Sequence, residues 1–163
     1  MRNERVTFLV QSAAIAAIYV VLTVAFAPFG FGEVQLRVSE ALTILPYFTP
    51  AAIPGLFIGC LIGNTLGGSI PLDIIFGSLA TLIAATGTYL LRKQRFLAPV
   101  PPIMANALIV PFILHYGYGV PLPIPFMMLT VGIGEVLSCG VMGMILLFAL
   151  ERYRGFLFRN AAI

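Results

Sequence analysis

The sequence predicts an all-α integral membrane protein, a bundle of six transmembrane helices that forms a single domain over residues 1–163. Of the side chains, 60% are apolar and only 9% are charged, whereas a soluble domain carries roughly 25% charged residues. The apolar residues stand in long runs without amphipathic spacing, which is typical of helices that face lipid. The nine Lys and Arg residues lie almost entirely in three short clusters at the ends of these runs. They therefore indicate membrane topology rather than a nucleic-acid surface.

Six apolar segments are predicted to be helical. The first follows Arg2 and Arg5 and ends where Pro28 and Gly30 interrupt the run. This region also imitates a secretory signal, with Ala-Phe-Ala at 25–27 as its cleavage site. Because the run is longer than the roughly 7–15 apolar residues of such a signal, we expect a retained first span. The predicted helices are residues 6–27, 41–48, 51–66, 71–91, 98–116 and 124–150.

The count of six depends on the proline-rich segment 41–68. This segment is too long for one simple span, and Pro46, Pro50 and Pro54 interrupt it, so we divide it into two helices. The positive-inside rule places the N-terminal arginines, the 92–95 cluster and the C-terminal arginines together in the cytoplasm, which requires an even number of spans between them. Both termini are therefore predicted to be cytoplasmic. The predicted external loops are residues 29–40, 67–70 and 117–123.

Small residues recur at helical spacing in two of the predicted helices. In the third helix they form a stripe without side chains, along which a neighbouring helix can approach closely, and we expect internal packing there. In the first helix they form a second small face, for which internal packing and binding to a partner protein both stay open. The stripe is Gly55, Gly59, Gly63 and Gly67, and the second face is Ser12, Ala13, Ala16 and Ala17.

Acids within the apolar segments are the sharpest functional signal, because a carboxylate at the bilayer centre costs about 2.5–3.5 kcal/mol on insertion scales. Glu135 lies roughly eleven residues into the last helix, about 16 Å at 1.5 Å per residue, and so close to the midplane. Asp73 lies in the first turn of the fourth helix. A hydrogen bond to another helix is the structural alternative for Glu135, and interaction with the helix dipole is the alternative for Asp73.

Further polar residues are predicted to share an external cavity with these acids. Asn64 and Asn106 offer paired donors and acceptors, although either also fits a clasp between helices. Arg37 and Glu40 lie three residues apart in the first external loop, where an ion pair or a cap is the default interpretation. His115 lies at the outer end of the fifth helix, beside tyrosines that an interfacial aromatic belt explains. The predicted substrate-binding residues are Arg37, Glu40, Asn64, Asp73, Asn106, His115 and Glu135.

Several classes of function lack their motifs in this chain. There is no Walker A sequence, and residues 132–134 (Gly-Ile-Gly) lack the third glycine and the preceding strand of a dinucleotide site. No nucleophile–His–acid set or zinc-protease motif occurs, so an enzyme is disfavoured. Cys60 and Cys139 fall inside apolar runs and, with the single histidine, match no recognised metal spacing. No metal and no cofactor are predicted.

Two segments of the chain carry a family resemblance, residues 34–64 (VQLRVSEALTILPYFTPAAIPGLFIGCLIGN) and residues 71–85 (PLDIIFGSLATLIAA). Both resemble the QueT family. QueT proteins are assigned as substrate-binding (S) components of energy-coupling factor (ECF) transporters for queuosine precursors. The recognisable segments cover about half of the chain, and the family agrees with its length, six predicted helices and cytoplasmic termini.

The resemblance implies more than composition gives. It implies the six-helix fold of ECF S components in a bacterial cell membrane, with the ligand near the external side under the loop between the first two helices. It also implies a transmembrane coupling subunit (EcfT-type), which meets an Ala-x-x-x-Ala face that Ala13 and Ala17 match. Two cytoplasmic ATPases (EcfA-type) would drive the cycle, which accounts for the missing Walker motif. The implied ligand is a deazaguanine base such as aminomethyl- or cyano-deazaguanine, or queuine.

The predicted site is chemically compatible with such a base. One carboxylate can accept both the amide N–H and the exocyclic amine of the base, and an aminomethyl group would add a cation that needs a second acid. Glu40, Asp73 and Glu135 supply the acids, while Asn64 and Asn106 can meet the carbonyl and ring nitrogens. Which acid contacts which ligand group stays open.

Three other functions fit part of the pattern. The first is an S component for another vitamin or nucleobase. The second is a small proton-coupled carrier that uses Glu135 and Asp73 as its relay. The third is a membrane scaffold that transports nothing.

Overall fold

The computed structural model describes residues 2–30 and 36–158, and all regular elements within these ranges are helices. The predicted all-α class is therefore confirmed, while residues 31–35 of the predicted loop 29–40 lie outside the described ranges. In chain order the elements are α1 (Arg2–Ala25), α2 (Ala27–Gly30), the 3-10 helix η1 (Val38–Tyr47), α3 (Ala52–Leu66), α4 (Pro71–Leu90), the 3-10 helix η2 (Arg95–Leu97), α5 (Val100–Phe112), the π-helix η3 (Ile113–Gly117), α6 (Ile124–Glu135), the π-helix η4 (Val136–Met142), α7 (Gly143–Glu151) and α8 (Arg154–Leu157).

Four helical stretches in the described residues are long and apolar enough to cross a membrane. Their outward faces carry large apolar side chains such as Leu9, Ile83 and Ile145, which are 57–65% exposed. Soluble monomers rarely expose apolar surface on this scale. The chain is therefore a multi-pass membrane protein. The four stretches are Glu4–Ala25, Pro71–Leu90, Arg95–Gly117 and Ile124–Glu151.

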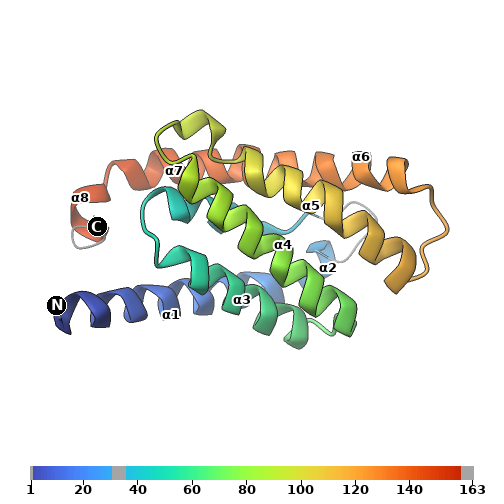
Figure 1. Cartoon of the computed structure of the whole chain (residues 1–163), viewed down its shortest axis with the longest axis horizontal. Helices are drawn as coiled ribbons and strands as arrows, with labels where there is room; N and C mark the ends of the chain where they lie inside the picture. The colour runs from blue at the N-terminus through green and yellow to red at the C-terminus, as the bar shows by residue number, and fades with distance from the viewer. Residues whose placement is uncertain (1, 31–35, 159–163) are drawn as a thin grey trace.

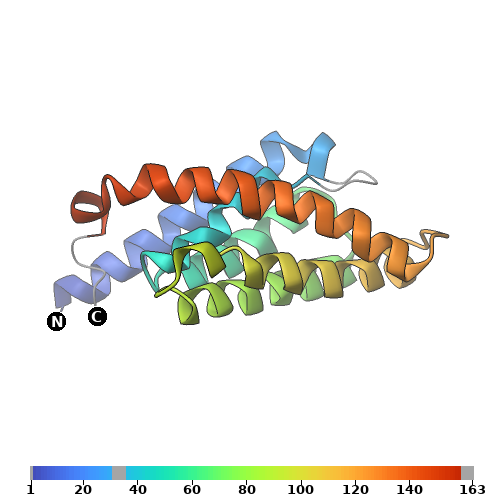
Figure 2. The ribbon, with the colours of Figure 1, turned by 90° about the horizontal axis from the view of Figure 1, so that it is seen from above.

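The long helices lie side by side around η1. Contacts join α1 to α3, α3 to α4, α4 to α5 and α5 to α6, and η1 contacts α1, α3, α4, η4 and α7. Figures 1 and 2 show the start of α1, the segment 91–97 and α8 at one end of the bundle, which we call the terminal end. The turns 67–70 and 117–123 lie at the opposite end, which we call the loop end. The basic clusters thus share one end, as the predicted topology requires.

The predicted second helix, 41–48, is the buried 3-10 helix η1. Pro46 provides no N–H group, and the Thr43 hydroxyl donates to the carbonyl oxygen of Glu40 at 2.6 Å, so two regular α-helical bonds are lost or contested. Its ten residues span about 20 Å at 2.0 Å per residue, less than the roughly 30 Å of a bilayer core. All residues of η1 from Ser39 to Pro46 are buried within the protein. This segment therefore brings side chains into the interior and has no lipid-facing surface over those residues.

Helix ends differ from the prediction where prolines and π-helical turns occur. The first helix ends at Ala25, and Pro28, which was expected to break it, lies in the first turn of α2, where its missing N–H is tolerated. Pro111 removes one donor inside α5, and the helix continues as the π-helix η3. The predicted helix 124–150 is continuous through α6, η4 and α7, so Glu135 directly precedes a π-helix.

The glycine stripe of α3 packs against α1, as the sequence predicts. A Cβ atom at Gly55 would lie 2.7 Å from the Ser12 carbonyl oxygen, and one at Gly59 would lie 2.8 Å from the Cβ atom of Tyr19. Both distances are shorter than real Cβ contacts, so the two backbones can approach this closely only with glycine. Gly67, the last member of the stripe, is the C-cap of α3.

The small-residue face of α1 divides into two parts. Ser12 and Ala16 are buried, and the Ser12 hydroxyl donates to the Ala51 carbonyl oxygen at 2.8 Å. Ala13 and Ala17 are exposed on the outside of the bundle. Internal packing therefore uses one half of the face and leaves the other half accessible.

Candidate functional site

Six of the seven predicted substrate-binding residues are buried, each at most 8% exposed. They come from different elements, because a charged or amide side chain on a lipid-facing helix can avoid hydrocarbon only by pointing into the bundle. Hydrogen bonds and ion pairs sort them into two layers along the bundle axis. The six are Arg37, Glu40, Asn64, Asp73, Asn106 and Glu135.

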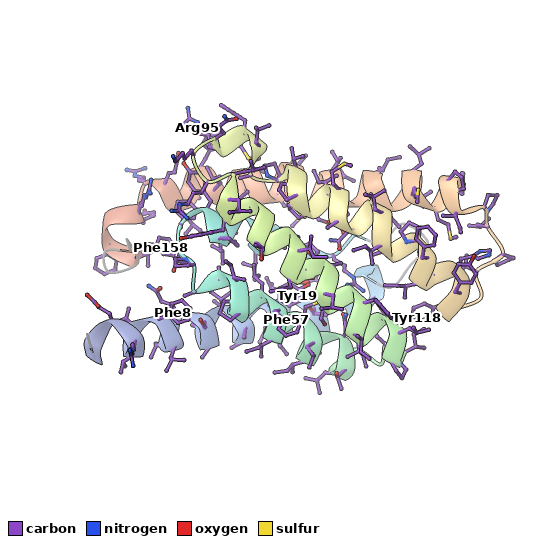
Figure 3. The ribbon with its side chains drawn as sticks, in the orientation of Figure 1. Phe8, Tyr19, Phe57, Arg95, Tyr118 and Phe158 are labelled. Carbon is purple, nitrogen blue, oxygen red and sulfur yellow. The ribbon has the colours of Figure 1, made fainter. Side chains whose placement is uncertain are left out.

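The end layer, near the loop end, consists of Arg37, Asp73 and Tyr118. The guanidinium of Arg37 lies 3.6 Å from Asp73 Oδ2, and the Tyr118 hydroxyl donates to the same oxygen at 2.9 Å. The Ile70 amide donates to the Tyr118 hydroxyl oxygen at 3.4 Å, and the Asn64 amide donates to the Asp73 carbonyl oxygen at 3.4 Å. Figure 3 labels Tyr118 at this end. The Tyr118 hydroxyl thus joins the 117–123 loop both to the 67–70 turn and to the Arg37–Asp73 ion pair.

The central layer consists of Tyr19, Glu40, Asn106, Glu135 and Cys139. The Tyr19 hydroxyl donates to Glu40 Oε1, and the Asn106 amide donates to Glu40 Oε2 at 3.5 Å. The Cys139 thiol donates to Glu135 Oε2 at 3.1 Å. One carboxylate oxygen of each acid and the Cys139 sulfur lie within 4.8 Å of one another. Figure 3 labels Tyr19 near the middle of the bundle, so this layer lies deeper than Tyr118.

The two acids of the central layer face each other without a cation between them. Among the described residues, neither Glu40 nor Glu135 has an ion-pair partner within 4.0 Å. The three donor atoms are close enough to share one cation. The two carboxylates can accept hydrogen bonds from an organic cation, whereas a metal ion would also require the thiolate form of Cys139.

Two buried side chains have unused hydrogen-bonding capacity. Asn64 Oδ1 and Ser138 Oγ belong to residues that are 0% exposed, and neither atom has a hydrogen-bond partner in the part of the chain that the structure describes. An unmet buried polar group costs about 1–3 kcal/mol. The polar interior is thus incompletely satisfied by its own side chains.

For Arg37 and Glu40 the sequence left an ion pair or a cap as the default interpretation. Arg37 is the N-cap residue of η1 (φ −90°, ψ 101°), and its carbonyl oxygen accepts from the Glu40 amide at 3.0 Å. Its guanidinium pairs with Asp73, while the Glu40 carboxylate accepts from Tyr19 and Asn106.

His115 lies apart from both layers. It belongs to η3 at the loop end, and its ring meets the Tyr116 ring edge-on with centroids 4.9 Å apart. Within the described ranges, no hydrogen bond or ion pair joins His115 to the end layer or the central layer. Of the seven predicted residues, it is the one that the fold does not bring into the polar interior.

A cavity of about 410 Å³ lies on the outside of the loop end, between α4, α5 and η3. Apolar side chains such as Leu72, Phe76 and Phe112 line it, and no residue of the end layer or the central layer is among the lining residues. Phe76 and Phe112 are about half exposed, at 47% and 45%. This hollow therefore has the character of a lipid-facing groove and not of a polar ligand site.

Three residues of the two layers, Tyr19, Tyr118 and Cys139, were not predicted from the sequence. Tyr19 had a usable signal, because Ser12, Tyr19 and Thr23 recur at helical spacing on one side of an otherwise apolar helix. Cys139 follows Glu135 by four residues and so lies on the same side of its helix. Tyr118 had no such signal, since an interfacial tyrosine is equally expected without a ligand.

Comparisons with known proteins agree on one family. The family model described as the QueT transporter matches residues 9–152. The queuosine precursor transporter QueT of Lactococcus lactis subsp. cremoris (strain MG1363) is 35% identical over 85 residues, which are 51% of this chain and 50% of that protein. The alignment thus spans about half the length of this relative. No solved structure matches the chain.

Proposed function

The chain belongs to the QueT transporter family, and from this premise we propose that it is the substrate-binding (S) component of an ECF importer for queuosine precursors. The family is one of transporters, in agreement with the expectation that the chain is not an enzyme. In this proposal the protein binds a deazaguanine base from the external side of a bacterial cell membrane. It then delivers the base through an EcfT-type coupling subunit, driven by two EcfA-type ATPases.

The observation that carries this proposal is the buried central layer. Glu40 and Glu135 are 1% and 3% exposed in the middle of a bundle whose outer surface is apolar. Polar groups at such depth are costly and are normally retained for a ligand, an ion path or a partner group. A purine-like base fits, because its N–H groups need acceptors and its carbonyl needs a donor such as Asn106.

We assign the other predicted residues by their places in the two layers. Asn64 offers its unmet Oδ1 to the ligand from the side of the end layer. Arg37 and Asp73 close the site toward the loop end, where the ligand enters. His115 stands at the same end and contacts the ligand during entry rather than in the bound state.

The proposed topology has six membrane segments and cytoplasmic termini, with η1 and α3 as the two short ones. The segment 91–97, the start of α1 and α8 lie together at the terminal end, which supports a cytoplasmic assignment for that end. Exposed Ala13 and Ala17 on α1 then form the face that docks on the coupling subunit.

Uptake in cells tests the proposal. The chain is expressed in a bacterium that cannot synthesise queuosine, with and without an ECF coupling module, and queuosine in transfer RNA is measured after a precursor is supplied. We expect queuosine to appear only when both the chain and the module are present. Uptake that persists without the module and disappears when the proton gradient is dissipated would contradict the proposal.

That contrary result would favour a proton-coupled carrier. The close approach of Glu40 and Glu135 is the observation that supports this second candidate, because paired carboxyl groups can bind and release a proton. The carrier and the S component differ in their energy source, so the uptake experiment separates them.

A further inference from the structure

The polar interior contains more acids than cations. Three buried carboxylates, Glu40, Asp73 and Glu135, share this region with one guanidinium, that of Arg37. Asp73 and Arg37 pair with each other at 3.6 Å. The acids of the central layer are therefore left to each other, with carboxylate oxygens within 4.8 Å.

Two carboxylates at this separation cannot both stay charged in a water-poor interior at low cost. Burying one isolated charge is already unfavourable, and a like charge beside it adds repulsion. The usual solutions are a shared proton, as in paired catalytic acids, or a cation between the two groups. Among the described residues, Arg37 is the one buried cation near the pair: its charge acts on Glu40 and Glu135 from beyond ion-pair distance, while its guanidinium is paired with Asp73.

The other groups around the pair do not neutralise it. Tyr19 of α1 and Cys139 of η4 contact the acids as hydrogen-bond donors, and Cys60 of α3 is buried nearby. Phenols and thiols are uncharged near neutral pH, since their ordinary pKa values lie above about 8. Asn106 of α5 donates an N–H but carries no charge.

A second observation points to a guest at this position. Ser138 is completely buried, follows Glu135 by three residues on the same side of the helix, and has a hydroxyl without a hydrogen-bond partner among the described residues. Beside the end layer, where the Asn64 amide donates to the Asp73 carbonyl oxygen, Asn64 Oδ1 is a buried acceptor that is also unmet among the described residues. The acids therefore lie in surroundings that can still bond a donor group.

We propose that Glu40 and Glu135 form a cation subsite, which shares one proton when empty and releases that proton when a primary ammonium group of the ligand binds between the two carboxylates. The inference rests on the proposed function, since it assigns one part of the same ligand site. It selects, among bases of similar shape, those that carry a protonated amine.

The exchange balances in charge. The empty pair holds two carboxyl groups and one proton, with a net charge of −1. When the ammonium group enters, the proton leaves to solvent and both carboxylates accept hydrogen bonds from the cation, so the net charge of the filled subsite is again −1. Binding of an amine is therefore linked to the release of one proton, whereas binding of an uncharged analogue is not.

Aminomethyl- and cyano-deazaguanine provide the matched ligands, because they share the ring and differ in the charge of one short substituent. Calorimetric titration of the purified full chain at pH 6, 7 and 8, in buffers with different ionisation enthalpies, measures affinity and proton release together. We expect the aminomethyl base to bind at least tenfold more tightly than the cyano base. Its affinity should rise with pH while about one proton is released per ligand.

The variants Glu135→Gln and Glu40→Gln remove one charge each with little change in shape. Each should abolish proton release and weaken binding of the aminomethyl base at least tenfold more than binding of the cyano base. Glu151→Gln is the matched control, because Glu151 pairs with Arg95 at the terminal end, away from the subsite. It should bind both bases as the parent chain does.

Three results would overturn the inference. Equal affinity for both bases without proton release would remove the cation subsite and leave the proposed function standing. One equivalent of a divalent metal in the purified protein, measured by mass spectrometry and lost from Glu135→Gln, would show that a metal occupies the position. Failure of the parent chain to bind either base would remove the proposed function and the inference together.

Discussion

The end layer and the central layer contain similar residues but balance their charges differently. In the end layer, Asp73 faces a guanidinium and a phenol hydroxyl, so its charge is met within the protein. In the central layer, Glu40 and Glu135 face each other and receive only neutral donors. A buried acid that is paired with a cation of the protein can stabilise the fold. Two buried acids without such a cation are expected to gain stability from a bound cation. Under the proposed function, this difference separates residues that hold the structure from residues that recognise the ligand.

The largest effect is expected in the end layer. Arg37→Met leaves the Asp73 carboxylate buried without its cation, which should cost about 3–5 kcal/mol of stability. The change is measured as a lower midpoint of thermal unfolding in detergent. A thiol-reactive dye suits this assay, because Cys60 and Cys139 are buried and react only on unfolding. Adding Asp73→Asn to the variant should recover most of the loss, since the uncompensated charge is then removed.

Arg95→Met is the control for this comparison. Arg95 and Glu151 are also 3.6 Å apart, but their side chains are 49% and 27% exposed, and such pairs contribute only about 0–1 kcal/mol. A loss from Arg95→Met as large as that from Arg37→Met would show that burial does not distinguish the two ion pairs.

In the central layer, removal of one charged side chain should raise the stability of the empty protein instead of lowering it. Glu40→Gln keeps an acceptor oxygen for the Tyr19 hydroxyl, and Asn106 can turn its amide oxygen toward the new N–H group. The change removes one of two buried acids that compete for a single proton. The stability of the empty protein should therefore rise slightly, by no more than about 1 kcal/mol. Stabilisation by an aminomethyl ligand, about 2.7 kcal/mol at a hundredfold excess over Kd in the parent chain, should be lost. A strong destabilisation of the empty variant would mean that the central layer is a structural pair like the end layer.

The sequence predicted which side chains would be buried better than how they would pair. A carboxylate or amide in a lipid-facing helix has one acceptable direction, so the inward placement of Glu135 and Asn106 follows from composition alone. Pairing depends on the rotation and depth of each helix, which the glycine contacts between α1 and α3 set. For this reason the sequence could not predict that the Arg37 guanidinium pairs with Asp73, 36 positions further along the chain.

The same distinction applies to the fold. Long apolar runs predicted the all-α membrane class and the glycine stripe, because both follow from local spacing. The nature of η1 could not be predicted, since a short apolar segment with Pro46 fits a membrane helix and a buried 3-10 helix equally well until its neighbours are placed. The count of six spans stays a prediction. His115 was grouped with the site although residues at a membrane interface have no fixed direction.

A smaller effect is expected at the outer edge of the end layer. Tyr118→Phe removes one hydrogen bond to Asp73, which should cost about 0.5–1.5 kcal/mol. We expect the lower part of that range because Tyr118 is 41% exposed. The difference in unfolding midpoint between the parent chain and this variant measures it, with the exposed Tyr116→Phe as the control.

The difference in stability between the parent chain and Tyr118→Phe should depend on pH in a definite direction. Burial raises the pKa of Tyr118 above its ordinary value, so folding favours the protonated hydroxyl. Its contribution is fully present below the ordinary value of about 10 and is lost as the pH rises through the raised value of the folded protein. The parent chain and Tyr118→Phe should therefore differ by a constant amount from pH 7 to 9 and converge above about pH 10. A difference that is already lost near pH 7 would exclude the phenol as the donor.

Substitutions on the outside of α1 are expected to have the smallest effect on stability and ligand binding. Ala13→Leu with Ala17→Leu adds apolar side chains to exposed positions of a lipid-facing helix, so stability and ligand binding should stay within about 0.5 kcal/mol of the parent chain. Close approach of a partner helix should nevertheless be blocked, since small residues are what permits it. Co-purification with the coupling subunit should therefore fall at least tenfold. Ala14→Leu adds one leucine on a neighbouring exposed side and should leave most of the complex intact, because position 14 is turned about 100° from Ala13 and about 60° from Ala17 around the helix axis. Equal loss of the complex in both variants would place the docking face elsewhere on α1, and a loss of ligand binding would show that this surface and the two layers are not independent.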